Sequence, residues 1–199
     1  MNLPTALTLS RIFLCPFFLA AYLYPHQLGI KNFFQPILLI VLMVFMLTTD
    51  ALDGYLARKW KIVTKIGKLL DPMSDCIVFL SIFFSFTRPP IELPLWIPIL
   101  MMVREISVVY LRSLIALQQQ AMGARWTGKV KTIVQSVALG AALFGLLLFT
   151  LELVDLETLQ KSSFWLFCFT AAISIFSLVE YLVHCKEVIR KGFASPSME

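Results

Sequence analysis

The chain has 199 residues, of which 59% are apolar and 15% charged, and its mean hydropathy is +0.83. Soluble domains contain about 45–50% apolar residues, so the composition excludes an ordinary soluble globular protein. The formal net charge is +5. The basic residues lie between and beside apolar segments, and nothing in their pattern indicates a nucleic-acid partner.

The apolar residues gather in six segments, several of which have the roughly 17–25 residues that a helix needs to cross a bilayer. We therefore predict an all-α integral membrane protein with six transmembrane helices in a single domain, residues 1–199, with residues 194–199 as a flexible tail. The third segment is short unless Asp71 and Asp75 belong to the same helix as the apolar residues that follow them. In chain order the segments cover residues 7–24, 33–49, 72–87, 93–117, 132–151 and 162–183.

Basic residues favour one orientation in the membrane. Five Lys or Arg residues lie between the second and third segments and three precede the fifth, whereas the alternate loops contain few. Short loops rich in Lys and Arg stay in the cytoplasm, so six spans place both termini there. The same basic side attracts anionic lipid head groups. The first segment lacks the basic start and cleavage site of a signal peptide, and we interpret it as a retained helix.

Four aspartates occur where the second and third segments meet. Their pattern, D-x2-D-G-x2-A-R-x8-G-x3-D-x3-D, has eight specified positions and would match somewhere in this chain by chance with a probability on the order of 10⁻⁷. Aspartates three or four residues apart share a helix face, and two such faces form the all-oxygen site that hard divalent cations prefer. Solvated helix caps are a poor alternative, because clustered carboxylates repel one another unless cations relieve the repulsion. The positions are Asp50, Asp53, Gly54, Ala57, Arg58, Gly67, Asp71 and Asp75.

Three further positions of the pattern suit a phosphate-bearing ligand. Gly54 and Gly67 lack a Cβ and allow the close approach of a ligand, or of another helix. Arg58 has the planar fork that binds phosphate, although it equally suits an anchor at the cytoplasmic membrane surface.

All eight positions match the signature of the CDP-alcohol phosphatidyltransferase family, which the chain therefore resembles. The resemblance implies six transmembrane helices, a homodimer and an active site facing the cytoplasm, in a bacterial inner membrane. It implies that the four aspartates bind two divalent cations, Mg²⁺ or Mn²⁺, and that Asp75 is also the general base. It further implies that Gly54, Arg58 and Gly67 hold the CDP group of CDP-diacylglycerol.

The first residues of the chain resemble the family's opening, N-x-P-N-x-L-T-x-x-R. Thr8 and Arg11 match this opening, whereas Thr5 stands where the second Asn is usual. We include Thr8 among the residues expected to bind the CDP-lipid and leave Thr5 out.

The second half of the chain carries basic residues in and beside apolar segments. Arg104 and Arg112 are eight residues apart, roughly on one helix face, and Lys129 and Lys131 precede the fifth segment. We predict that these four side chains form a basic pocket that faces the aspartates and binds the phosphate of an acceptor. The open alternatives are an ion pair of Arg104, with Glu105 or a neighbouring helix, and anchoring of the two lysines at the membrane interface.

The stretches R-E-I…L-R and G-K-x-K-T resemble those of the bacterial family members that act on glycerol 3-phosphate. This implies attack of the primary hydroxyl of glycerol 3-phosphate on CDP-diacylglycerol, giving phosphatidylglycerophosphate and CMP. Inositol phosphate is the alternative acceptor. A divalent-cation transporter is an alternative of another class, because intramembrane carboxylates mark ion pathways. The aspartates all lie at one end of the helices, which disfavours transport, and a noncatalytic scaffold needs no carboxylate cluster.

Overall fold

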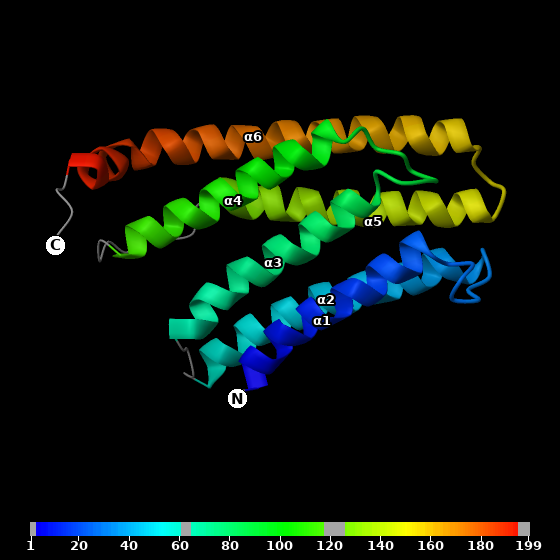
Figure 1. Cartoon of the computed structure of the whole chain (residues 1–199), viewed down its shortest axis with the longest axis horizontal. Helices are drawn as coiled ribbons and strands as arrows, with labels where there is room; N and C mark the ends of the chain where they lie inside the picture. The colour runs from blue at the N-terminus through cyan, green and yellow to red at the C-terminus, as the bar shows by residue number, and fades with distance from the viewer. Residues whose placement is uncertain (1–2, 61–64, 118–125, 195–199) are drawn as a thin grey trace.

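The computed structural model consists of helices and their connections in the residues that it describes (Figure 1). These are residues 3–60, 65–117 and 126–194, without the side chains of residues 3–5, 57–58, 65–71, 113–117, 185 and 187–194. Each helix covers one of the six predicted apolar segments, which confirms the all-helical prediction for this part of the chain. The helices are α1 (Leu3–Leu23), α2 (Phe34–Lys59), α3 (Lys65–Ser85), α4 (Trp96–Leu117), α5 (Trp126–Thr150) and α6 (Leu156–Ala194).

Several helices extend beyond their apolar segments into polar sequence. α3 begins at Lys65, so the backbones of Asp71 and Asp75 lie in the same helix as the apolar residues that follow them. α5 likewise starts at Trp126, before Lys129 and Lys131. Lys, Arg and Glu are good helix formers, so backbone hydrogen bonding continues where the apolar residues end.

Four helices are long and apolar enough to cross a membrane. The apolar part of α3, Pro72–Ser85, is shorter, and α4 carries three charged residues in its interior. Large apolar side chains face outward, among them Phe13 at 72% exposure and Trp165 at 70%. Such extended exposed apolar surface fits contact with lipid, as in an integral membrane protein. The long apolar stretches are Ala6–Leu23, Phe34–Leu56, Trp126–Thr150 and Leu156–His184.

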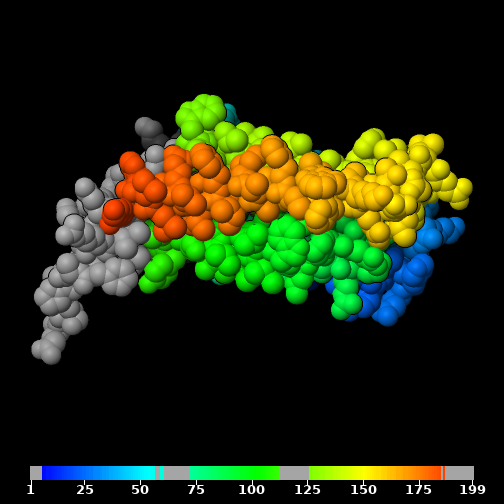
Figure 2. Space-filling view, turned by 90° about the horizontal axis from the view of Figure 1, so that it is seen from above, coloured from blue at the N-terminus to red at the C-terminus, as the bar shows by residue number. Residues whose placement is uncertain are grey.

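The helices form two layers of three. In one layer α1 packs against α2 and α3, and in the other α6 packs against α4 and α5. Figure 2 shows α6 as a ridge with α4 on one side and α5 on the other. Contacts of α2 with α5 and of α3 with α4 join the layers. The start of α1 and the end of α6 lie at the same end of the bundle as the end of α2 and the start of α3 (Figure 1).

Aromatic rings and one glycine hold the two layers together. The rings of Phe83 on α3 and of Phe86, the first residue after α3, lie 5.7 and 5.8 Å from the ring of Phe167 on α6, centroid to centroid. On α5, a Cβ at Gly140 would lie 3.6 Å from Cε of Met43 on α2. Small residues let membrane helices approach closely. These contacts fix α2, α3 and α5 around a common pocket.

Candidate active site

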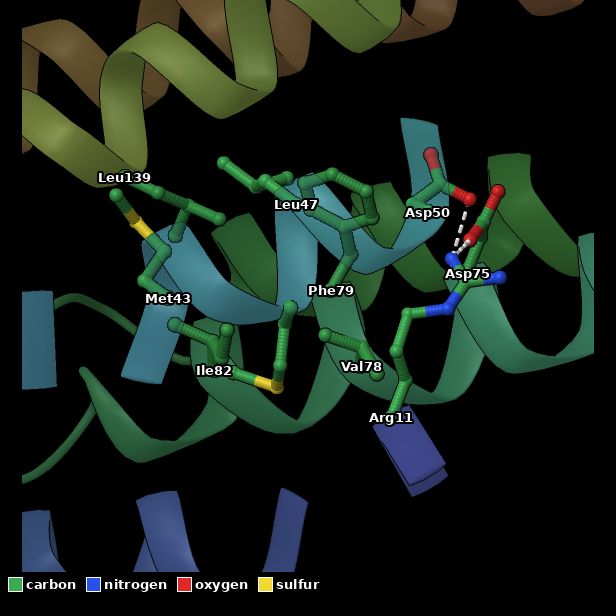
Figure 3. A pocket seen from close by; sticks show the side chains of 10 residues that line it. Arg11, Met43, Leu47, Asp50, Asp75, Val78, Phe79, Ile82 and Leu139 are labelled. Atoms are coloured by element: carbon green, nitrogen blue, oxygen red, sulfur yellow. Dashed lines mark hydrogen bonds and ion pairs between the residues drawn. The ribbon is translucent and has the colours of Figure 1, made fainter. Parts of the chain in front are cut away.

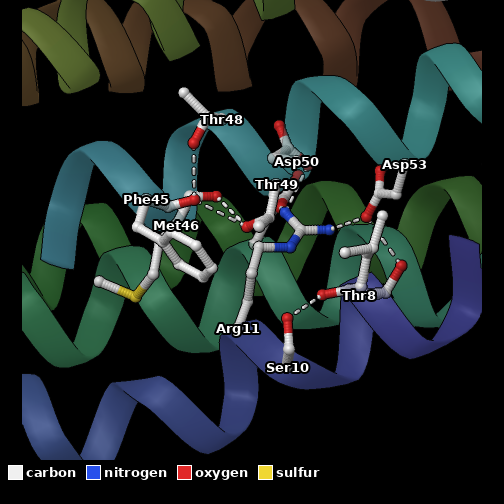
Figure 4. A network of polar contacts seen from close by, with 11 residues as sticks. Thr8, Ser10, Arg11, Phe45, Met46, Thr48, Thr49, Asp50 and Asp53 are labelled. Carbon is white, nitrogen blue, oxygen red and sulfur yellow. Dashed lines mark hydrogen bonds and ion pairs between the residues drawn. The ribbon is translucent and has the colours of Figure 1, made fainter.

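Three of the four predicted aspartates converge on one arginine of α1; Figure 4 shows its contacts with Asp50 and Asp53, and Figure 3 those with Asp50 and Asp75. Nη1 of Arg11 donates to Oδ1 of Asp50 and also to Oδ1 of Asp75, the latter at 2.5 Å. Nη2 of Arg11 donates to Oδ2 of Asp53 at 2.9 Å. Asp50 and Asp53 share a face of α2 because they are three residues apart. The carboxylates of α2 and the Asp75 carboxylate of α3 therefore meet around one guanidinium.

The cluster has a buried part and an accessible part. The side chains of Arg11 and Asp53 are only 3% and 4% exposed, whereas those of Asp50 and Asp75 are 40% and 39% exposed. Oγ1 of Thr8 donates to Oδ2 of Asp53 at 2.9 Å, so a predicted lipid-binding residue here holds a carboxylate. The accessible oxygens of Asp50 and Asp75 remain within reach of a ligand.

The other residues of the aspartate pattern are placed less completely. Gly54 follows Asp53 in α2 and is half-buried. Arg58, Gly67 and Asp71 fall within α2 or α3 by backbone, but they lie outside the residues whose side-chain surroundings the structure describes. Among the described side chains, no group of three or more His, Cys, Asp or Glu residues is arranged to hold a metal ion. The carboxylates instead surround a guanidinium.

Arg11 lies at the centre of the carboxylate cluster, and sequence reasoning assigned it no role. Its match to the family's opening was visible, but no role followed from that match. A stronger signal was available, because a charged residue within an apolar helix is costly and requires a partner. The aspartates of the pattern were candidates for that partner, but they lie 39 to 64 residues further along the chain, and the sequence alone did not pair them with Arg11.

A pocket runs from the carboxylates into the apolar interior (Figure 3). The pocket is narrow, with a cavity volume of about 20 Å³, and Arg11, Asp50 and Asp75 lie at one end of it. Its remaining wall is apolar and comes from α2, α3 and α5. The chemistry of this lining, charged at one end and apolar elsewhere, matches that of an amphiphilic ligand with a charged head and a hydrocarbon part. The apolar lining consists of Met43, Met46, Leu47, Val78, Phe79, Ile82 and Leu139.

A second charged cluster centres on Glu105 of α4. Its carboxylate pairs with Nζ of Lys131 on α5 and accepts hydrogen bonds from Nη1 of Arg104 at 3.1 Å and Nε2 of Gln135 at 3.2 Å. Nη2 of Arg104 donates to Oγ of Ser177 on α6 at 2.9 Å. All five side chains are buried. The two cations and one carboxylate leave one net positive charge where α4, α5 and α6 meet.

Of the four predicted acceptor-binding residues, Lys131 lies nearest to the aspartate-bearing helices. Its Nζ is 5.9 Å from the ring centroid of Phe79, which follows Asp75 on α3 by one turn. Arg104 instead points to Glu105 and α6, which is the ion pair that the sequence left open. Lys131 and Phe79 therefore connect the basic cluster to the pocket.

The other two predicted acceptor-binding residues are exposed. Nε of Arg112 donates to Oη of Tyr181 on α6 at 3.1 Å. Its Nη2 would lie 3.6 Å from a Cβ at Gly128, in the first turn of α5. Lys129 is exposed beside it in sequence. Arg112 and Lys129 thus lie near the start of α5 with side chains accessible to a soluble anion.

The bundle consists of long apolar helices, and a carboxylate cluster lies at the charged end of a pocket whose other walls are apolar. We expect this arrangement in an enzyme that modifies lipid head groups. Residues 1–181 match the CDP-alcohol phosphatidyltransferase family, and the chain belongs to this family. It is therefore an enzyme, a transferase of phospholipid biosynthesis.

Relatives in several bacteria carry a common name, CDP-diacylglycerol–glycerol-3-phosphate 3-phosphatidyltransferase. The relative from Yersinia pestis is 32% identical over 188 residues, which are 92% of this chain and 93% of the relative. The relative from Pectobacterium atrosepticum is 36% identical over 149 residues, 72% of this chain and 77% of the relative. The relative from Bacillus subtilis is 34% identical over 148 residues, 71% and 76% of the two chains.

Proposed function

We propose that the chain transfers the phosphatidyl group of CDP-diacylglycerol to the primary hydroxyl of glycerol 3-phosphate, giving phosphatidylglycerophosphate and CMP. The observation that carries this proposal is the similarity over 92% of the chain to a relative named for that reaction. The pocket supports it, because a polar end at Asp50 and Asp75 continues into an apolar wall. A CDP-lipid has the same division between charged head and acyl chains.

Two divalent cations, Mg²⁺ or Mn²⁺, would be held by Asp50, Asp53, Asp71 and Asp75. The donor set fits, since carboxylate oxygens are the ligands that these hard cations prefer. Three of the four carboxylates already share a cation, the guanidinium of Arg11, so their oxygens face a common point. When bound, divalent cations neutralise phosphate charge and stabilise a departing phosphate.

Asp75 is the proposed general base. Its carboxylate is 39% exposed and lies at the polar end of the pocket, where a hydroxyl group can reach it. The acceptor oxygen forms a bond to the β-phosphorus of the CDP-lipid, the bond from that phosphorus to the CMP oxygen breaks, and CMP leaves with the electron pair. The hydroxyl proton passes to Asp75. Thr8, Gly54, Arg58 and Gly67 are proposed to hold the CDP group.

The acceptor's phosphate is proposed to bind Arg104, Arg112, Lys129 and Lys131. Support comes from Lys131, which lies over Phe79 one turn from Asp75. Arg112 also supports the proposal, because its exposed guanidinium lies near the start of α5, where it can bind a phosphate. Arg104 contributes charge through the buried cluster on Glu105. A positive region of this kind favours an acceptor that carries its own phosphate over a neutral alcohol.

We further propose that all six helices cross a bacterial inner membrane and that both termini and the carboxylate cluster face the cytoplasm. The start of α1 and the end of α6 both lie at the cluster end (Figure 1), which supports this topology, together with the basic residues at that end. A homodimer is proposed from family membership.

The test is release of CMP by the purified protein with CDP-diacylglycerol and Mg²⁺ or Mn²⁺. Glycerol 3-phosphate, inositol phosphate, inositol and serine are added one at a time, and the lipid product is identified by mass spectrometry. We expect CMP release only with glycerol 3-phosphate, and its loss with EDTA. In the same assay Arg112→Ala should raise the KM for glycerol 3-phosphate more than that for CDP-diacylglycerol.

Other results would contradict parts of this proposal. CMP release with inositol phosphate instead of glycerol 3-phosphate would support the phosphatidyltransferase activity and change the proposed acceptor. Equal effects of Arg112→Ala on both KM values would remove Arg112 from the acceptor site. Metal uptake by vesicles without any CMP release would indicate transport.

A further inference from the structure

Arg11 bridges the two helices that carry the aspartates. Its single Nη1 nitrogen contacts one oxygen of Asp50 on α2 and one oxygen of Asp75 on α3. Its Nη2 nitrogen contacts Asp53, deeper in the bundle. The guanidinium is therefore placed between the accessible carboxylates, and not behind them as an outer support (Figure 3).

The pairing relieves two electrostatic problems of the chain without metal. Carboxylates brought together by α2 and α3 repel one another and resist packing of the two helices. An arginine side chain that is 3% exposed within an apolar helix needs counter-charges. Pairing of Arg11 with the three carboxylates meets both needs.

A divalent cation shared by Asp50 and Asp75 would need the position that Nη1 now holds. Mg²⁺ binds carboxylate oxygens at about 2.0–2.1 Å, and Nη1 is already in direct contact with the same two oxygens. Two cations at such short separation repel strongly in a site that is only partly open to water. Metal and guanidinium are therefore competitors for these oxygens.

We propose that Arg11 is the resident counter-ion of the carboxylate cluster, and that a divalent cation bridging Asp50 and Asp75 displaces its Nη1 nitrogen. This inference rests on the proposed metal site. Arg11 acts as a positioning residue: it stabilises the metal-free protein and weakens metal binding. An arginine that merely oriented metal ligands from outside would strengthen metal binding, so the two roles predict opposite signs.

The experiment measures Mn²⁺ binding by electron paramagnetic resonance, with the full chain purified in detergent and no nucleotide present. Thermal unfolding in EDTA and in excess Mn²⁺ is followed in parallel. Arg11→Gln should lower the Tm in EDTA, tighten Mn²⁺ binding about tenfold and enlarge the rise in Tm that Mn²⁺ produces. Arg11→Lys keeps the charge but has a single nitrogen. Its Tm in EDTA and its Mn²⁺ affinity should lie between those of Arg11→Gln and the wild type.

Arg104→Gln is the matched control, because Arg104 is also a buried arginine but pairs with Glu105. It should lower the Tm and leave Mn²⁺ affinity unchanged.

Unchanged or weaker Mn²⁺ binding by Arg11→Gln, with normal binding by the wild type, would overturn the role of Arg11 alone. Absence of Mn²⁺ binding by the wild type and both Arg11 variants would overturn the metal site itself. If Arg11→Gln does not fold, the affinity of Arg11→Lys decides, and a value equal to the wild type would overturn the inference.

Discussion

Asp75 is distinguished from Asp53 by the surroundings of its carboxylate. Asp53 is buried and receives hydrogen bonds from Thr8 and Arg11. Asp75 is 39% exposed and lies at the charged end of the pocket. A base must reach the proton that it removes, and of these two carboxylates only Asp75 meets that requirement.

Replacing Asp75 with Asn tests the proposed base. Asp75→Asn should lower CMP release by at least about 100-fold, since general-base catalysis contributes roughly 10²–10⁴-fold. Binding of a CDP-lipid analogue should be retained in part, because the other aspartates remain. CMP release and analogue binding are measured on the same preparation.

Asp155 provides the matched control for that substitution. Its exposed carboxylate accepts a hydrogen bond from the backbone N of Thr158 at 3.1 Å, at the start of α6, and hydrogen bonds from Thr158 hold the pKa of Asp155 below its usual range. Asparagine caps a helix as well as aspartate does, so Asp155→Asn should leave CMP release unchanged. Full activity of Asp75→Asn would remove Asp75 as the base.

Residue types and spacing predicted the convergence of the aspartates, but not their partner. The three- and four-residue spacings place Asp50, Asp53 and Asp75 on helix faces, and the structure brings these faces together. Arg11 was outside the prediction because it comes from α1, far along the chain from the aspartates. Packing of α1 against α2 and α3 supplies that contact, and a local pattern carries no information about it.

At the scale of the helices, α4 and α5 are joined through Glu105. Removal of its charge leaves Lys131 and Arg104 as buried cations without a carboxylate. Removing one partner of a buried ion pair costs about 3–5 kcal/mol of unfolding free energy. Glu105→Gln should therefore lower stability by about this amount, measured by denaturant unfolding in detergent.

A second substitution separates this electrostatic effect from a loss of packing. In Glu105→Gln with Lys131→Met, one of the two stranded cations is gone, so part of the lost stability should return. A double variant less stable than Glu105→Gln alone would show that the Lys131 side chain stabilises the protein by packing, and would contradict the stranded-cation account. A cost of less than about 1 kcal/mol for Glu105→Gln would contradict the buried-charge account.

Helix extents were predicted in their apolar parts and missed in their polar ends. Hydropathy marks the residues that prefer lipid, whereas a helix continues as long as its backbone hydrogen bonds do. This difference explains why α6 runs over Leu156–Ala194, although the apolar segment covers only residues 162–183. It also explains why α3 includes the backbone of Asp71, which the apolar pattern alone left undecided.

At the scale of the whole molecule, the sequence predicted the number of apolar segments but not their neighbours. In lipid, apolar side chains gain little by choosing another helix over the surrounding hydrocarbon, so hydropathy does not reveal which faces pack. The fit of side-chain shapes determines which faces pack instead. Gly140 admits Met43 between α5 and α2, and the rings of Phe83 and Phe167 join α3 to α6. The two-layer arrangement emerges only from such contacts.

The arrangement predicts which parts of the chain each side of the membrane can reach. Lys59 is exposed at the end of α2, the end of the bundle that carries the carboxylates, and Leu153 is 69% exposed in the turn between α5 and α6. In a variant without its native cysteines, Leu153→Cys should react with a membrane-impermeant maleimide added outside spheroplasts. Lys59→Cys should react only after the membrane is opened.

Inverted vesicles from the same cells supply the control, because the labelling order should reverse in them. Labelling of both cysteines from one side would mean that the helices between them cross the membrane an even number of times, which is incompatible with six spans. Labelling of Lys59→Cys alone from outside spheroplasts would keep the six spans and invert the protein. The carboxylate cluster would then face away from the cytoplasm, and the proposed use of CDP-diacylglycerol and glycerol 3-phosphate from the cytoplasmic side would fail with it.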